Sequence, residues 1–284
     1  MKAFSKKLLA VAAGLALTSV SALASHVPAL SCGPEKFNVN PLALNTVPGA
    51  TAPETNPAFV AGSISFDYRA LVTQDGTVSP ATFAENGSVF FNPFRVSVGG
   101  QAINVATSGL GLNYELYALF TALGTSTTNG AGGRDGLFND FGIQFFVDRD
   151  SNTTFNASGT QTSTAPTGGI ADDVLVLTGN LQVGGFHVFP NLAAGDFDVI
   201  FNVTGFGATS FFSTTTDGQR LSQGDLNGVN STIIGLGSGT GSFVNAEIDG
   251  SGNNTYQSIP EPTSLALVGI ALVGGALARR KAQA

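Results

Sequence analysis

The residues of this chain that are best suited to chemistry form a short polar run, Asp148-Arg149-Asp150-Ser151-Asn152. Its first, third and fifth side chains carry oxygen atoms, and they follow residues 141–147, whose apolar alternation predicts a β-strand. Calcium prefers several oxygen ligands, and a loop that begins in this way can direct them at one ion. Two further aspartates stand at the far end of the same loop. The sequence therefore predicts a calcium site with five ligand residues, Asp148, Asp150, Asn152, Asp172 and Asp173.

The predicted calcium loop differs from an EF-hand. Thr153 stands at the sixth position, where an EF-hand has glycine, and Gly159 stands in the place of the bidentate glutamate. The alternative interpretation is a solvated polar turn, because acidic residues are frequent at the start of loops in secreted β proteins. A second, weaker candidate for calcium is Asp225-Leu226-Asn227-Gly228.

The supply of catalytic groups argues against an enzyme. His187 is the only histidine apart from His26, so a histidine cluster for a metal such as zinc is not available. No Gly-x-Ser-x-Gly turn marks a nucleophilic serine. Asp196 and Asp198 would share one face of a strand, but nothing places them in the cleft that glycoside hydrolysis needs. We therefore expect no catalytic residue. A hydrolase that uses Asp196 or His187 is the alternative.

The C-terminal residues carry a pattern that concerns transport. Pro260-Glu261-Pro262 precedes an apolar run over residues 265–278, and three basic residues follow, Arg279, Arg280 and Lys281. A helix over this run is about 21 Å long, against a hydrocarbon core of about 30 Å. Its small residues make it less hydrophobic than a leucine-rich span. The basic residues are typical of a cytoplasmic flank, so we expect the body of the protein on the other side of the membrane.

This three-part pattern resembles the PEP-CTERM sorting signal of Gram-negative bacteria that secrete exopolysaccharide. The resemblance implies that the tail is held transiently in the inner membrane and that an exosortase cuts the chain close to Pro260-Glu261-Pro262. The alternative is an ordinary C-terminal membrane helix, which has the same topology.

The N-terminal residues predict a signal peptide. Three lysines precede an apolar stretch over residues 8–17, and Ala22 and Ala24 then supply small residues at the two positions that a signal peptidase reads. We expect cleavage after Ala24. Cys32 is the only cysteine and lacks a leucine-led lipobox, so we expect neither lipid attachment nor an internal disulfide.

The body between these two segments is strongly acidic. It holds six basic and 18 acidic residues, a net charge of about −12. So few cations exclude a nucleic acid or an anionic membrane surface as the partner of the body. The charge favours solubility and attracts divalent cations, as expected of a protein in a polyanionic matrix.

The sequence of the body predicts strands. Alternation of apolar and polar residues places them at residues 64–72, 94–98, 114–120, 143–147, 173–178 and 199–203. Turns are expected at Asp75-Gly76, Asn86-Gly87, Asp135-Gly136 and Asp217-Gly218. Residues 114–122 and 174–177 are apolar on both faces, which predicts strands in the middle of a sheet. The 22 phenylalanines are expected to fill the interior.

Many antiparallel strands without crossover helices predict an all-β fold, a single β-sandwich with jelly-roll or Greek-key connections. An N-terminal signal helix and a C-terminal membrane helix are expected to flank it. The expected organisation is a signal peptide at residues 1–24, an extended leader at 25–58, the sandwich at 59–257 and the sorting signal at 258–284.

Segments of the body add a second resemblance. Residues 115–120, 145–154 and 172–179 resemble those of flocculation-associated PEP-CTERM proteins, which are implied to hold cells together with exopolysaccharide. We therefore expect an exported, non-enzymatic protein of the cell surface or biofilm matrix, with signal peptidase, exosortase and exopolysaccharide as partners. The alternative is a calcium-dependent glycan-binding module. The absence of tryptophan makes an aromatic platform for sugars unexpected, so such a module would bind through polar loops or a bridging calcium.

Overall fold

The computed structural model describes residues 36–48, 53–75, 79–129, 133–156, 164–189, 194–207, 210–214, 221–236 and 243–257. The predicted signal helix, with Ala22 and Ala24, and the predicted C-terminal membrane helix lie outside these residues. Within the described ranges, no helix combines the length and the hydrophobicity that a bilayer crossing requires.

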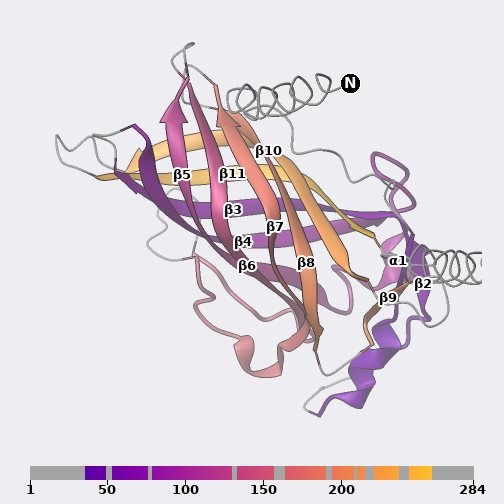
Figure 1. The fold of residues 1–284 in the computed structure, drawn as a ribbon. Coiled ribbons are helices and arrows are strands. Elements are labelled where there is room, and N and C mark those ends of the chain that lie inside the picture. The colour runs from indigo at the N-terminus through magenta and orange to yellow at the C-terminus, as the bar shows by residue number, and fades with distance from the viewer. Residues whose placement is uncertain are drawn as a thin grey trace, which may run out of the picture.

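Eight antiparallel strands form a closed barrel (Figure 1). They are β3 (Ser63–Asp75), β4 (Ala81–Arg95), β5 (Glu115–Thr128), β6 (Arg134–Asp148), β7 (Val174–Val188), β8 (Gly195–Phe206), β10 (Gln223–Leu236) and β11 (Phe243–Gln257). Each strand pairs with the next barrel strand along the chain, and β11 pairs with β3 to complete the ring.

The predicted β-sandwich is therefore wrong, while the all-β class is confirmed. Alternating side chains give a strand one buried and one outer face in either architecture, so the pattern does not distinguish them. The pairing between β11 and β3 decides, and it runs from Phe243 opposite Asp75 to Asn254 opposite Ile64. The connections are a simple meander, and no Greek-key crossing occurs among the described strands.

A three-stranded sheet closes one end of the barrel, at the right of Figure 1, where α1 (Val105–Ser108) also lies. It consists of β2 (Phe59–Ala61), β1 (Phe37–Val39) and β9 (Phe212–Thr214). The Phe37 ring lies 4.9 Å from Tyr256 of β11, centroid to centroid, and Phe212 lies 6.5 Å from Phe145 of β6. We call this the plugged end, where β3 begins and β11 ends. The distal end is where β3 ends and β4 begins.

Part of the segment expected to be an extended leader packs against the barrel. Phe37 and Val39 of β1 are fully buried, and Leu44 of the 3-10 helix η1 (Pro41–Thr46) is almost so. These side chains belong to the same apolar core as the barrel residues at the plugged end.

Inside the barrel, glycines face aromatic side chains directly across neighbouring strands. In seven glycine–aromatic register pairs of the described strands, the ring supplies the side-chain atoms nearest to a Cβ added to the glycine: Gly87–Phe120, Gly124–Phe83, Gly136–Phe186, Gly224–Phe201, Gly228–Phe197, Gly250–Tyr68 and Gly252–Phe66. A Cβ atom at Gly87 would stand 2.0 Å from the Phe120 ring, and one at Gly224 would stand 2.1 Å from Phe201. The close approach of ring and backbone therefore requires glycine.

These pairs explain why two predicted turns are wrong. Asn86-Gly87 lies in the middle of β4 and Asp135-Gly136 lies in β6, because their glycines accommodate rings instead of turning the chain. Asp75 ends β3 near the predicted position. Gly76 and Asp217-Gly218 lie outside the described residues.

The connection between β6 and β7 covers part of the outer wall. Phe155 in this loop packs its ring 4.8 Å from Phe90 of β4 and 5.3 Å from Tyr117 of β5, and Tyr117 stacks on Phe146 of β6. This cover accounts for the apolar residues on both faces of β5. β5 therefore lies in the wall of the barrel and not in the middle of a sandwich sheet.

Candidate metal centre

The end of β6 and the start of β7 bring three aspartates together. The two strands are antiparallel neighbours and Val147 pairs with Val174, so the register places Asp148 beside Asp173. The 3-10 helix η2 (Ile170–Asp172) adds Asp172. One carboxylate oxygen of each aspartate lies within 4.8 Å of the other two. We call these three residues the aspartate cluster.

Backbone and hydroxyl groups of the loop fix the orientation of the cluster. Asp148 is fully buried, and its Oδ2 accepts a hydrogen bond from the backbone N–H of Thr153 at 2.7 Å. The Thr153 hydroxyl donates to both carboxylate oxygens of Asp173, at 3.0 and 3.1 Å. The loop therefore directs oxygens from the end of β6 and from the residue before β7 toward one another.

The other two predicted ligands lie beside the cluster in a different role. The backbone N–H of Asp150 donates to Asp148 Oδ1 at 3.2 Å and to Asp172 Oδ2 at 3.0 Å. The Asn152 side-chain amide donates to Asp172 Oδ1 at 3.2 Å. In this geometry both residues supply hydrogen-bond donors, and Asp148, Asp172 and Asp173 supply the oxygens.

Two further side chains at the cluster were not predicted. The Tyr117 hydroxyl donates to Asp173, and the Arg149 guanidinium donates to the backbone oxygens of Asp172, Val47 and Pro48. Tyr117 lies on a neighbouring strand, so no spacing in the sequence links it to the loop. Arg149 belongs to the predicted polar run. Its hydrogen bond to Pro48 spans 101 residues of sequence, so the sequence near Arg149 does not reveal that contact.

The electrostatics of the cluster favour binding of a cation. Burial raises the pKa of Asp173, and the neighbouring charges of Asp148 and Asp172 raise it further, against the hydrogen bonds from Tyr117 and Thr153. Burial and the charge of Asp148 also raise the pKa of Glu115, at the start of β5. An ion such as calcium would relieve this repulsion, because an all-oxygen set of carboxylates suits hard cations. Zinc, which prefers nitrogen and sulfur, suits it less.

His187, considered for catalysis, lies at the distal end, away from the cluster. Its Nδ1 pairs with Asp135 Oδ1 of β6, and across the other side it stands opposite Asp196 of β8. The histidine thus lies in a row of cross-strand polar neighbours near the strand ends.

The carboxylates that pair on β8 and β10 are Asp198 and Asp225, instead of Asp196 and Asp198. Burial, followed by the charge and hydrogen bond of Asp198, raises the pKa of Asp225 to about 7. Asp225 lies within β10, so the second candidate for calcium is part of a strand and not of a loop.

The plugged end also leads to the C-terminal segment, since β11 ends at Gln257. Residues 258–281 match the PEP-CTERM protein-sorting motif. The chain carries a PEP-CTERM sorting domain. The match spans Pro260-Glu261-Pro262, the apolar run and the three basic residues. No curated protein and no solved structure matches the chain.

The PEP-CTERM motif implies an exported protein that an exosortase processes at the membrane for delivery to the cell surface. The motif begins at residue 258, immediately after the last residue of β11. Tyr256, two residues earlier, is buried in the core. A cut at or after Pro260 would therefore leave every residue of the barrel strands in the processed protein.

Proposed function

We propose that this protein is a non-enzymatic component of the cell surface or extracellular matrix, associated with exopolysaccharide and flocculation. In this proposal signal peptidase removes residues 1–24, the tail anchors the protein transiently in the inner membrane, and an exosortase releases the barrel. The observation that carries the proposal is the PEP-CTERM motif directly after β11. The acidic body supports it, because such a charge suits a matrix of polyanions bridged by divalent cations.

Deletion of the gene tests this assignment. We expect the deletion strain to flocculate poorly, wild type to restore flocs, and Glu261→Ala to restore them poorly because its tail is not processed. Asp67→Asn, an exposed change on β3, is the matched control and should restore flocs fully. Normal flocculation of the deletion strain would refute the matrix role. Full rescue by Glu261→Ala with an uncut tail would refute the role of processing.

The aspartate cluster favours a second candidate, a calcium-dependent glycan-binding module. Three carboxylates from β6, η2 and the residue before β7 converge within 4.8 Å, and an ion held there has further coordination positions that sugar hydroxyls can fill. A pull-down of the exported protein on purified matrix polysaccharide, with and without chelator, separates the two candidates. Saturable binding that the chelator and Asp173→Asn both abolish supports the module. Retention of the protein on the polysaccharide that neither the chelator nor Asp173→Asn changes supports the structural role.

A further inference from the structure

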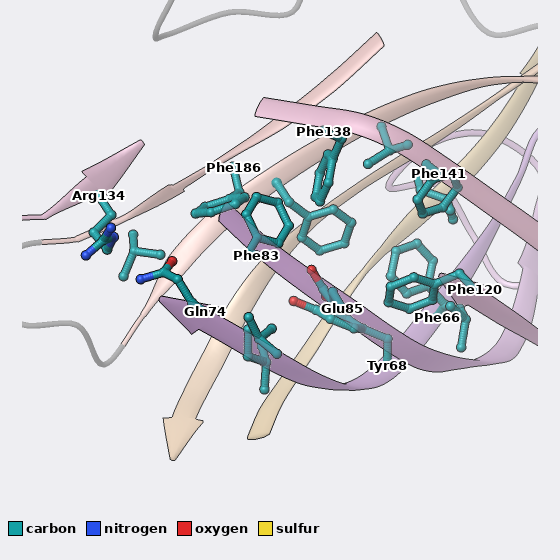
Figure 2. A pocket seen from close by; sticks show the side chains of 17 residues that line it. Phe66, Tyr68, Gln74, Phe83, Glu85, Phe120, Arg134, Phe138, Phe141 and Phe186 are labelled. Carbon is teal, nitrogen blue, oxygen red and sulfur yellow. The ribbon is translucent and has the colours of Figure 1, made fainter. Parts of the chain in front are cut away.

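The distal half of the barrel contains a partly open apolar cavity of about 170 Å³. All eight barrel strands contribute to its wall, and most of the lining side chains are aromatic or aliphatic (Figure 2). Four lining residues are polar: Tyr68, Gln74, Glu85 and Arg134. An eight-stranded barrel is just wide enough either to be filled by its side chains or to hold one small ligand, and here part of the interior is unfilled.

The glycine–aromatic pairs are the reason why the interior is unfilled. Six of the seven paired rings line the cavity: Phe66, Tyr68, Phe83, Phe120, Phe186 and Phe197. Each ring packs over a glycine of the adjacent strand and so lies along the wall. A side chain in place of the glycine would push the ring toward the barrel axis. The glycines thus allow the rings to lie against the wall, and these rings form most of the aromatic lining of the cavity.

Glu85 is the exceptional group in this cavity. Figure 2 shows its carboxyl group, together with the Tyr68 hydroxyl, pointing into the interior between the rings. Among the described residues, the Glu85 carboxyl makes no hydrogen bond or ion pair. The Glu85 side chain is half-buried by accessible surface, and its apolar surroundings raise its pKa to about 7. A carboxyl without a partner in such surroundings lowers stability, and groups of this kind in a cavity mark candidate binding sites.

Arg134, the one cation of the lining, is engaged elsewhere. It lies with Gln74 toward one side of the cavity (Figure 2). Its Nε and one terminal nitrogen donate to Ser126 Oγ at 3.2 and 3.0 Å, and that hydroxyl donates to Gln74 Oε1 at 2.8 Å. This chain of hydrogen bonds leaves the Glu85 acceptor oxygens for a molecule inside the cavity.

We propose that the cavity binds a small apolar molecule, about the size of one aromatic ring, whose single hydroxyl group donates a hydrogen bond to Glu85. The size follows from the volume, because an apolar protein cavity of about 150 Å³ accommodates benzene. The donor follows from Glu85, because above pH 7 its carboxyl group is ionised and an ionised carboxylate only accepts hydrogen bonds. The aromatic walls provide edge-to-face and stacked contacts for the ring. This site is independent of the aspartate cluster, which lies at the plugged end.

Calorimetric titration of the exported protein with phenol and with benzene at pH 8, where Glu85 is ionised, tests the proposal. We expect saturable binding of both, with benzene bound about tenfold more weakly because it lacks the charge-assisted hydrogen bond. Glu85→Leu should remove the preference for phenol and retain benzene. Val72→Phe, opposite Glu85 on β3, should fill the cavity and abolish binding of both compounds. Asp67→Asn, on the outer face of the same strand, is the control and should bind as wild type does.

Three results would overturn the proposal. If wild type gives no saturable heat with phenol, or if Val72→Phe binds phenol as wild type does, the cavity is not a ligand site. If Glu85→Leu keeps the preference for phenol over benzene, Glu85 is not the acceptor. None of these results bears on flocculation, so the failure of this inference is distinguishable from that of the proposed function.

Discussion

Replacement of Glu85 by glutamine should make the protein more stable at high pH and leave it nearly unchanged at low pH. The carboxyl group faces an apolar cavity, and burial raises its pKa from 4.5 to about 7. In the unfolded chain the group keeps its ordinary value. The folded state therefore holds its proton more tightly, and the stability that comes with that proton is complete below pH 4.5 and is lost as pH rises through 7.

The magnitude follows from the two pKa values. Each pKa unit corresponds to about 1.36 kcal/mol, so ionised Glu85 lowers the free energy of unfolding by about 3 kcal/mol. Glutamine has the same shape and carries no charge, so it does not incur this loss. The gain of Glu85→Gln over wild type should therefore grow by about 3 kcal/mol between pH 4 and pH 9.

Urea unfolding of both proteins at pH 4, 6, 8 and 9 measures this growth. The difference between the two pH profiles cancels the contribution of Asp225, whose raised pKa acts in the same direction in both proteins. Asp67→Asn removes one negative charge from the outer face of β3 and should follow the wild-type profile. Parallel profiles for wild type and Glu85→Gln would show that water or a cation already solvates the carboxylate, and our account of the cavity would be refuted.

Three other changes test separate parts of the structure. Gly87→Ala should lower the free energy of unfolding by about 1–3 kcal/mol in the urea assay, because the new methyl group overlaps the Phe120 ring. Gly142→Ala is the control, because its methyl group would meet only Thr121 Oγ1 at 3.7 Å. An equal loss in the two variants would contradict the packing argument. Asp225→Asn should stabilise the protein above pH 7 and have little effect near pH 4, since the raised pKa of Asp225 makes its ionised form unfavourable; a gain that is the same at both pH values would contradict this. Calcium should raise the midpoint of thermal unfolding, and Asp173→Asn should remove that rise; an unchanged midpoint in wild type would refute the metal centre.

The strand pattern predicted much of the barrel wall but not its closure. Alternation over residues 64–72 and 114–120 located β3 and β5, because their inward positions carry large apolar side chains. β10 and β11 escaped prediction because glycine occupies inward positions such as 224, 228, 250 and 252. Their neighbours supply the rings, so the apolar alternation is absent from the two strands that close the barrel. The expected strand at 94–98 extends past the end of β4, and Val96 and Val98 are exposed.

The aspartate cluster could be predicted from the sequence because a hairpin brings the two ends of one loop together. Asp148 and Asp173 flank the connection between adjacent strands, so their positions at the two ends of one loop were sufficient to predict that they lie together. Glu85 and the Asp198–Asp225 pair were not predicted. Their significance depends on which neighbours surround them across strands, and a single strand shows only which face a residue occupies.

The pairing of β11 with β3 means that the main sheet closes on itself and has no terminal strand. An open sheet presents a row of unpaired N–H and C=O groups, onto which a second copy can add a strand and begin a fibre. Among the described residues, each barrel strand has a hydrogen-bonded neighbour on both sides, and the margins of the small sheet are only three residues long. Where copies accumulate at high density, the described barrel strands therefore favour cohesion through side chains, bridging ions or other polymers, and cohesion of that kind can be reversed without unfolding the protein.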